Sequence, residues 1–311
     1  MAAAAAIERI VIATRESALA MWQARHVEAL LVAVYPHIEV EIRGITTEGD
    51  RQLDASLAKI GGKGLFVKEL EDTLARGEAD IAVHSMKDVP MELLAGHVIA
   101  AMPERADPRD AFVSIRYPNL AALPAGARVG TSSLRRESQL RVVRSGLAIE
   151  PLRGNVPTRL RKLDEGHYEA ILLAAAGLQR LGLAERITSL LTTAESLPAA
   201  GQGAIGIECR ADRVDLMRAL APLDHAPTAC CVRAERAVAR ALAGSCTVPL
   251  AAYGEVSAGE IRLRGFVGSP DGSRIARATL AGPATQAETL GLELAARLRE
   301  AGADEILAAL A

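Results

Sequence analysis

The chain has 311 residues, with 36 lysines and arginines against 38 aspartates and glutamates, and 50% of its residues are hydrophobic. This composition excludes a disordered chain or a fibre, and the length is typical of two or three domains that each bury a core. A formal net charge of -2 and 3% aromatic residues disfavour nucleic-acid binding, which needs a basic surplus for the phosphates and rings for base stacking.

The cysteines and the N-terminus predict the compartment. Four cysteines in a chain of this length are too few for a disulfide framework, and none stands at a zinc-ligand spacing. The alanine run at 2–6 follows no basic segment and soon meets Glu8 and Arg9, and no uncharged apolar stretch of about 18 residues follows. We therefore expect a cytoplasmic protein without a bound metal and without a membrane partner.

The first hundred residues alternate between apolar runs and amphipathic stretches. The predicted strands are 9–13, 38–45 and 80–84, and the predicted helices are 18–34 and 65–76. A glycine-bearing loop is expected at 46–64. Strands covered by helices in this order indicate α/β layers around a largely parallel sheet.

The same alternation restarts near residue 108 and predicts a second α/β domain. Its predicted strands are 111–115, 128–130, 148–152 and 170–176, and its predicted helices are 134–144, 157–165 and 178–183. A further strand at 206–209 cannot be assigned to either domain from periodicity. A helix at 228–242, strands at 251–256, 260–267 and 274–280 with hairpin turns between them, and a helix at 285–299 predict a small α+β domain. No internal repeat of fixed period is visible.

Arginines stand beside hydroxyl groups at three predicted strand ends. These segments are Thr14-Arg15-Glu16-Ser17, Thr131-Ser132-Ser133-Leu134-Arg135-Arg136, and 152–159 with Arg153, Asn155 and Arg159. Hydroxyls, backbone N–H groups and guanidiniums at a helix N-terminus bind anions, and ligands of α/β sheets bind at the carboxyl ends of strands. The segments together predict a site for a ligand with several carboxylates. In the alternative interpretation, Thr131 or Ser133 only caps a helix and the arginines are solvated.

An acidic residue, Asp88, follows the predicted strand 80–84 in the segment His84-Ser85-Met86-Lys87-Asp88-Val89-Pro90. In a basic pocket, the surrounding positive charge favours the carboxylate form. Such a carboxylate suits N–H donors or a cationic substrate, and it exchanges protons when correctly placed. An ordinary surface turn at Lys87 and Asp88 is the alternative.

Two further motifs are ambiguous on their own. Residues 201–206 match G-x-G-x-x-G, but they follow a loop and lead into a strand, so they favour a crossover segment over a dinucleotide site. Cys246 lies in the loop Gly244-Ser245-Cys246-Thr247-Val248-Pro249, where a thiol can be a nucleophile or an attachment point. Core packing is expected for the other cysteines, Cys209, Cys230 and Cys231.

Taken in this order, HSMKDVP, GTSSLRR, LRGNV, AAGQGAIGIE and the cysteine loop before Val248-Pro249 resemble the hydroxymethylbilane synthase family, also called porphobilinogen deaminase. The resemblance extends from about Ile10 to the last helix. It implies two α/β domains that resemble the halves of periplasmic binding proteins and flank a cleft, plus a small C-terminal α+β domain. The implied boundaries are 1–103 with 203–222, 108–198, and 226–311. A monomer is expected, and residues 47–64 correspond to a lid loop.

The resemblance also implies an activity and its residues. The family condenses four porphobilinogen molecules, with release of four ammonia molecules, into the linear tetrapyrrole hydroxymethylbilane of haem biosynthesis. A dipyrromethane cofactor, bound through a thioether to Cys246, primes the chain, and Asp88 matches the catalytic aspartate. The residues matched to cofactor binding are Lys87, Asp88, Thr131, Ser132, Ser133, Arg135 and Arg136. Those matched to binding of the substrate or growing chain are Arg15, Ser17, Gln23, Lys63, Arg153, Asn155, Arg159 and Arg180.

Two competing functions are weighed against this activity. A non-catalytic two-domain clamp for a small polycarboxylate anion has the same kind of fold, but it needs neither a third domain nor Cys246. An inactive family member is disfavoured because Asp88, Cys246 and the arginines are all present. The chain departs from the family pattern at Ser245 and Pro157, and neither departure removes a functional group.

Overall fold

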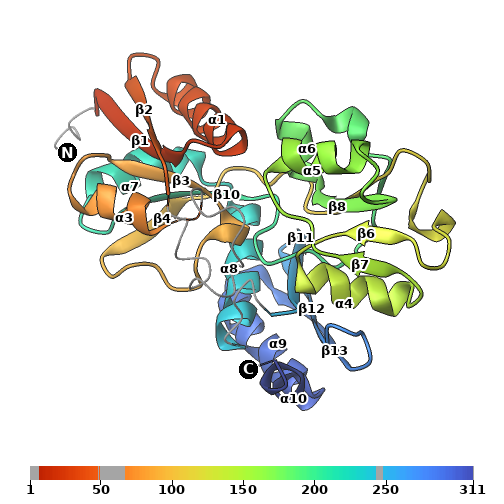
Figure 1. Ribbon diagram of the computed structural model, residues 1–311. Helices are drawn as coiled ribbons and strands as arrows, with labels where there is room; N and C mark the ends of the chain where they lie inside the picture. Colours follow the sequence, from red (N-terminus) through yellow and green to blue (C-terminus); the bar gives the residue numbers. More distant parts are fainter. Residues whose placement is uncertain (1–6, 48, 50–66, 243–247, 311) are drawn as a thin grey trace. The chain divides into compact units, whose positions relative to one another are not determined.

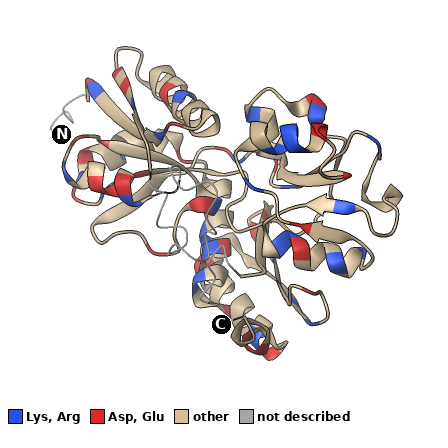
Figure 2. Cartoon of the chain, in the orientation of Figure 1, with Lys and Arg blue, Asp and Glu red and all other residues tan. Residues whose placement is uncertain are grey.

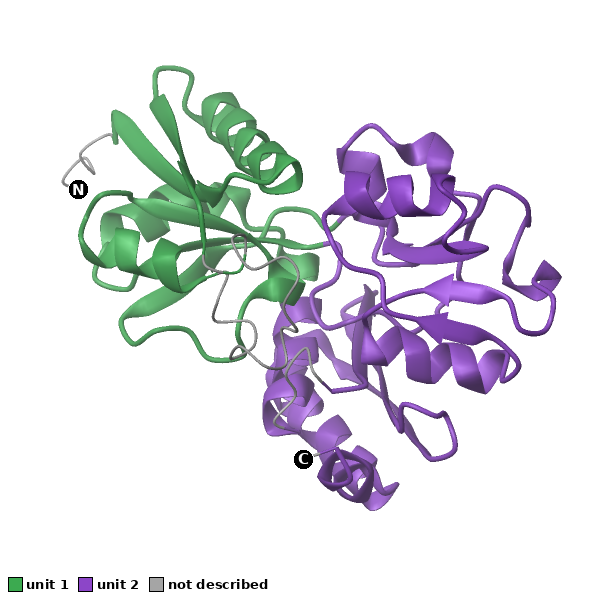
Figure 3. Cartoon of the chain, in the orientation of Figure 1, with its two compact units in different colours: residues 1–105, 204–229 green, residues 106–203, 230–311 purple. Residues whose placement is uncertain are grey.

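The computed structural model describes residues 7–47, 49, 67–242 and 248–310 (Figure 1). They form two compact units, shown in Figure 3. Unit 1 comprises residues 1–105 and 204–229, and unit 2 comprises residues 106–203 and 230–311. The chain therefore leaves unit 1 and returns to it, while the division into three domains stays a prediction. Figure 2 shows acidic and basic residues interspersed in both units, in keeping with the near-zero net charge.

Unit 1 is built on a five-stranded sheet in the order β2-β1-β3-β10-β4. Its strands are β1 (Arg9–Arg15), β2 (Glu39–Ile45), β3 (Ile81–Ser85), β4 (His97–Ala101) and β10 (Ile205–Arg210), and its helices are α1 (Ala18–Val34), α3 (Lys68–Ala75) and α7 (Val214–Leu220). β1 is parallel to β2 and β3, whereas β10 is antiparallel to β3 and β4. β4 therefore runs in the same direction as β1, β2 and β3, so the expectation of a largely parallel sheet is confirmed, with β10 of the returning chain as the one reversed strand of this sheet.

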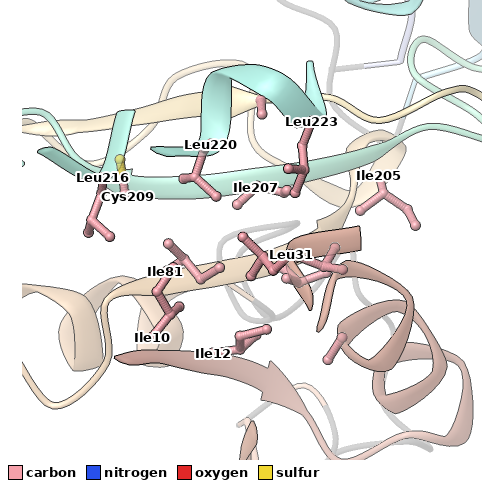
Figure 4. Close-up of a cluster of buried hydrophobic side chains, with 14 of the residues drawn as sticks. Ile10, Ile12, Leu31, Ile81, Ile205, Ile207, Cys209, Leu216, Leu220 and Leu223 are labelled. Carbon is pink, nitrogen blue, oxygen red and sulfur yellow. The ribbon is translucent and has the colours of Figure 1, made fainter. Parts of the chain in front are cut away.

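The two faces of this sheet are buried by different helices. Ile10 and Ile12 of β1 pack with Leu31 of α1 and with apolar residues of β10 and α7 (Figure 4). Val11 and Ala13, which alternate with them, pack on the other face with α3. Alternate residues of a strand point to opposite faces, so the run of apolar residues in β1 indicates a strand covered on both sides.

The first sheet of unit 2 has the order β7-β6-β8-β5-β9. Its strands are β5 (Asp110–Val113), β6 (Arg128–Gly130), β7 (Ala148–Glu150), β8 (Ala170–Ala174) and β9 (Ser189–Leu190), and its helices are α4 (Leu134–Val143), α5 (Val156–Asp164) and α6 (Ala175–Arg180). β6 is parallel to β7 and β8, and β5 is antiparallel to β8 and β9. This is the strand pattern of unit 1, so the fold repeats although the sequence shows no repeat.

A second sheet in unit 2 is an antiparallel meander, in the order β11-β12-β13. Its strands are β11 (Leu250–Ser257), β12 (Glu260–Gly268) and β13 (Ile275–Pro283), and the neighbouring helices are α8 (Ala226–Ala241), α9 (Ala287–Glu300) and α10 (Ala303–Ala308). The hairpin turn between β11 and β12 has positive φ at Ala258 and Gly259, as a two-residue turn of the primed type requires. A side chain at Gly291 would clash with the Ala234 carbonyl oxygen, which shows how closely α9 approaches α8.

Most of the predicted elements are confirmed within one to three residues, and the helix at 18–34 has the predicted limits. The strand predicted at 170–176 is wrong at its end, because Ala175 and Ala176 begin α6. The strands β4 and β9 and the helices α7 and α10 were not predicted. No helix within the described ranges combines the length and the apolar character needed to span a bilayer.

Candidate active site

The pocket in unit 1 lies where β1 and β3 end. The two strands are parallel, so their carboxyl ends meet at one edge of the sheet. Four residues predicted from the sequence line the pocket there, namely Arg15, Ser17, Gln23 and Asp88. The structure thus brings together side chains that are up to 73 positions apart in the chain, from 15 to 88.

The first turn of α1 is fixed to the end of β3 by two polar contacts. Ser17 caps α1, and its hydroxyl accepts a hydrogen bond from the backbone N–H of Ala20 at 3.3 Å. The buried Gln23 donates from Nε2 to the hydroxyl of Ser85 at 2.7 Å. These contacts hold one wall of the pocket, and Arg15 stands half-buried at its edge.

A single 3₁₀ turn, Met86–Asp88, carries Asp88. The backbone N–H of Met86 donates to the carbonyl of Ala204 at 3.0 Å, and the Met86 side chain is fully buried. A Cβ at Gly206 would lie 2.2 Å from the sulfur of Met86, so the last glycine of the G-x-G-x-x-G match makes room for this anchor. Lys87 and Asp88 are left half-buried on the anchored turn. Since residues 205–210 form β10 and no helix, the crossover interpretation of this motif is confirmed.

The predicted hydroxyl residues of unit 2 lie at the ends of β6 and β7. Ser133 caps α4 by accepting from the N–H of Arg136 at 3.4 Å, and Ser132 donates to the carbonyl of Leu152 at 3.0 Å. The second contact places this segment beside the segment 152–159. There Asn155 caps α5, and Arg159 donates from Nε to the carbonyl of Gly154 at 2.7 Å. Thr131 is buried, Ser132 and Asn155 are exposed, and Arg153 is half-buried.

Arg135 and Arg136 are buried against Asp110, so the interpretation that they are solvated is wrong. Asp110 is fully buried and accepts hydrogen bonds from four side chains. The donors are Arg135 Nη2 (2.9 and 3.2 Å), Arg136 Nε and Nη2 (3.1 and 2.7 Å), Ser196 Oγ (2.7 Å) and Gln202 Nε2 (2.9 Å). We call this group the Asp110 cluster.

The electrostatics of the Asp110 cluster favour an ionised carboxylate beside two charged guanidiniums. Burial alone raises the pKa of Asp110, but the charges of Arg135 and Arg136 and the hydrogen bonds from Arg136 and Ser196 outweigh it, and the pKa lies far below its usual range. Burial lowers the pKa of Arg135, and the charge of Asp110 opposes that change. Both guanidiniums are therefore already partnered inside unit 2, and each exposes only a small part of its surface.

Arg180 contacts the chain where it crosses between the units. Its Nη2 donates to the carbonyl of Gly203 at 2.7 Å, and burial lowers the pKa of Arg180 to about 10. Gly203 has φ +87°, and a side chain there would clash with the carbonyl oxygen of Ala106, so only glycine fits. The other predicted residues, Lys63 and Cys246, lie outside the described residues, as do residues 50–64 of the expected lid loop.

Sequence reasoning missed three buried polar residues near these sites: Asp110, His84 and Glu208. His84 lines the pocket of unit 1, and Glu208 lies beside it on β10. A usable signal was present, because acidic residues inside the short apolar runs 110–113 and 205–209 are unusual unless they are paired. Among the described residues, no group of three histidines, cysteines or acidic residues is placed to hold a metal ion.

Comparisons with known proteins agree over almost the whole chain. The family model "porphobilinogen deaminase, dipyromethane cofactor binding domain" matches residues 10–218, and the model of the C-terminal domain of porphobilinogen deaminase matches residues 229–300. The porphobilinogen deaminase of Chromobacterium violaceum is 60% identical over 304 residues, which are 98% of each chain. That of Methylobacillus flagellatus is 61% identical over 97% of each chain.

The solved structures include the periplasmic aliphatic sulphonate binding protein of Escherichia coli. It is 14% identical with a TM-score of 0.41, and the match covers 75% of this chain and 70% of that one. The two family models and the identity of about 60% to full-length relatives show that this chain belongs to the porphobilinogen deaminase, or hydroxymethylbilane synthase, family of transferases.

Proposed function

We propose that this chain condenses four porphobilinogen molecules head to tail into hydroxymethylbilane, releasing four ammonia molecules, with Asp88 as the catalytic residue. The observation that carries the proposal is the pocket of unit 1, where the carboxylate of Asp88 shares one lining with the guanidinium of Arg15 and the polar side chains of Ser17 and Gln23. Each porphobilinogen carries two carboxylates and one aminomethyl group, so a pocket with both a cation and an anion suits it.

Arg15 and Asp88 have separate tasks in this scheme. Arg15 binds a carboxylate of the substrate, which guanidinium groups do with two parallel hydrogen bonds. The carboxylate of Asp88 accepts a hydrogen bond from the pyrrole N–H. When ammonia leaves, positive charge spreads over the pyrrole ring and its nitrogen, and a fixed carboxylate at that nitrogen stabilises the charge as it develops.

The donors of unit 2 fit the family's dipyrromethane, which carries four carboxylates. Ser132 is exposed at the N-terminus of α4, whose first turn has backbone N–H groups without helical acceptors. Arg153 and Arg159 lie half-buried beside it, and Lys87 is half-buried on the Asp88 turn of unit 1. We assign these residues, with Thr131, Ser133 and the exposed edges of Arg135 and Arg136, to carboxylate binding. When bound, the dipyrromethane supplies the first nucleophilic pyrrole carbon. The thioether to Cys246 rests on the sequence match.

The first experiment compares the wild-type chain with Asp88→Asn and Cys246→Ala by intact mass and by turnover of porphobilinogen. We expect the wild-type chain and Asp88→Asn to carry the mass of two porphobilinogen units less two ammonia molecules, and Cys246→Ala to lack it. Asp88→Asn should lose at least about a hundredfold in kcat, the usual size of an acid-base or charge contribution. Near-normal turnover by Asp88→Asn would remove this residue from the mechanism. A wild-type chain without covalent mass or turnover would favour the non-catalytic clamp.

We also propose that the enzyme acts in the cytoplasm, as a monomer with three domains that comprise residues 1–103 with 203–222, 108–198, and 226–311. Cys209, Cys230 and Cys231 are buried and form no disulfide among the described residues, which is compatible with a reducing compartment. The change from one sheet of unit 2 to the antiparallel meander supports a boundary after α8 begins. Sedimentation of the holoenzyme and limited proteolysis test the oligomeric state and the boundaries.

A further inference from the structure

A buried acid-base pair in unit 1 has no part in the scheme above. His84 on β3 and Glu208 on β10 place Nε2 and Oε2 2.8 Å apart, and their side chains are 5% and 0% exposed. The register explains the contact, because His84 lies opposite Gly206 and Glu208 lies opposite Ala82 on the same face of adjacent strands.

The pair is close but incompletely satisfied. His84 Nε2 and both carboxylate oxygens of Glu208 are buried, yet none completes a hydrogen bond of normal geometry with the described residues. The N–H of the imidazole therefore does not point straight at the oxygen in this arrangement. Buried polar groups are nearly always satisfied, and the exceptions need an explanation such as a catalytic role.

The surroundings of the pair are rich in other titratable groups. Glu71 of α3 faces it, and burial together with the charge of Glu208 raises the pKa of Glu71, although its hydrogen bond from the Leu94 N–H opposes this change. His97 of β4 interacts with Glu71, and its ring nitrogens are buried without a hydrogen-bond partner among the described residues. On the open side, His84 lines the same pocket as Asp88 and Arg15. His84 is thus the member of this group that meets the pocket.

A carboxylate behind an imidazole selects one tautomer and stabilises the imidazolium that forms when the other nitrogen takes a proton. Each condensation requires such a proton acceptor. After the new C–C bond forms, the attacking pyrrole carbon must lose its proton. If Asp88 accepted that proton, it would be neutral until it gave the proton away again. A second base leaves the carboxylate of Asp88 ionised for the next loss of ammonia.

Building on the proposed function, we propose that His84 is a second catalytic residue, the base that takes the proton from the attacking pyrrole carbon, and that Glu208 positions it. The C–H bond breaks, its electron pair returns to the ring, and the proton moves to the imidazole. The imidazolium then gives the proton to the released ammonia, which leaves as ammonium. The step consumes no oxidant or reductant, and His84 is neutral again for the next round.

The test compares His84→Gln and Glu208→Gln with the matched variant His97→Gln, which replaces a histidine of the same sheet that does not line the pocket. Intact mass first confirms that each protein carries its covalent cofactor, and kcat and KM are then measured across pH 5 to 9. We expect His84→Gln to lower kcat about a hundredfold with little change in KM, and to lose the fall in activity at acid pH. His97→Gln should keep the wild-type profile.

Glu208→Gln separates a positioning role from a packing role. An uncharged amide cannot stabilise an imidazolium as a carboxylate does, so we expect the acid limb of the activity profile to move to lower pH in Glu208→Gln. NMR of protein labelled with ¹⁵N-histidine gives a measurement that does not depend on turnover. The chain has six histidines, and the signal that is missing from the spectrum of His84→Gln is the signal of His84. In Glu208→Gln, the titration of this signal should also move to lower pH.

Two outcomes would overturn the proposal while leaving the proposed function intact. One is an active wild-type enzyme whose His84→Gln variant keeps kcat within about twofold and retains the acid limb. The other, which decides the matter if His84→Gln does not fold, is a Glu208→Gln variant with unchanged pH profile and unchanged imidazole titration. A wild-type chain without turnover would instead count against the proposed function itself.

Discussion

Asp110 and Glu208 are buried carboxylates on corresponding strands of the two five-stranded sheets. β5 and β10 each run antiparallel beside the third parallel strand of their sheet. Asp110 accepts hydrogen bonds from two guanidiniums, a hydroxyl and an amide. Glu208 has only one imidazole beside it, and the N–H of that imidazole does not point at a carboxylate oxygen. Corresponding strands of the repeated fold thus hold a carboxylate with four hydrogen-bond donors in one unit and a carboxylate beside a single unaligned imidazole in the other.

The largest effect on stability is expected from removing the carboxylate of the Asp110 cluster. Asp110→Ala leaves two buried guanidiniums without a counter-charge, which typically costs about 3–5 kcal/mol of unfolding free energy. Urea unfolding measures the loss. The matched control is Asp107→Ala, which breaks a partly exposed pair with Arg109 and should cost less than about 1 kcal/mol. Equal losses from the two variants would show that the buried Asp110 contributes no more to stability than the partly exposed Asp107.

The second effect is a loss of stability in acid. The pKa of Asp110 is lower in the folded chain than in the unfolded chain, so the ionised cluster contributes fully above the ordinary carboxyl pKa of about 3.9, and the contribution is lost as the pH falls below it. Unfolding free energy measured from pH 6 to 2.5 should fall more steeply in the wild type than in Asp110→Asn. Parallel curves would mean that other carboxyls dominate acid unfolding.

A smaller effect is expected from trimming one donor of the cluster. Ser196 donates to Asp110 at 2.7 Å, and its side chain is buried. Ser196→Ala should cost about 1 kcal/mol, the usual net contribution of one hydrogen bond, because Asp110 keeps its other donors. The measurement is again urea unfolding. A loss as large as that of Asp110→Ala would indicate that the cluster acts only as a whole.

The smallest expected effect is a gain in stability. It concerns Glu71, which lies beside the pair of His84 and Glu208. Burial and Glu208 raise the pKa of Glu71, so its ionised form is less favourable in the folded chain, and its contribution is lost as the pH rises above the ordinary glutamate value. Glu71→Gln removes this cost at pH 7 and still accepts from Leu94. A slightly raised melting temperature at pH 7, absent at pH 4, is expected. A destabilised variant at both values would refute the assignment.

Local chemistry explains which parts of the molecule could be predicted from the sequence. The helix at 18–34 was predicted with its limits because Ser17 marks its start and apolar residues follow at helical spacing. The strand at 170–176 was extended too far because a run of alanines has no periodicity to mark the change into α6. Arg15, Ser17 and Asp88 were found because their motifs follow strand ends, where parallel neighbours bring them together, whereas Gln23 came only from the family resemblance.

The partners of buried charges could not be predicted in this way. Asp110 and Arg135 are 25 residues apart, and their contact depends on β5 lying beside β8, which no local pattern records. The antiparallel direction of β10, and with it the contact between Glu208 and His84, likewise depends on the return of the chain to unit 1. Arg135 and Arg136 were interpreted as ligand-binding or as solvated, so their place in the core of unit 2 was not recognised.

The central place of β10 has a consequence for synthesis on the ribosome. β3 and β4 are separated in the sheet by a strand that is translated about a hundred residues later, at 205–210. Until that segment emerges, the nascent unit 1 has open strand edges in its middle, and such edges invite pairing with other chains. The first sheet of unit 2, by contrast, has all its strands by residue 190. The first 105 residues are therefore the part of this protein that we expect to need chaperones more, although they are made first.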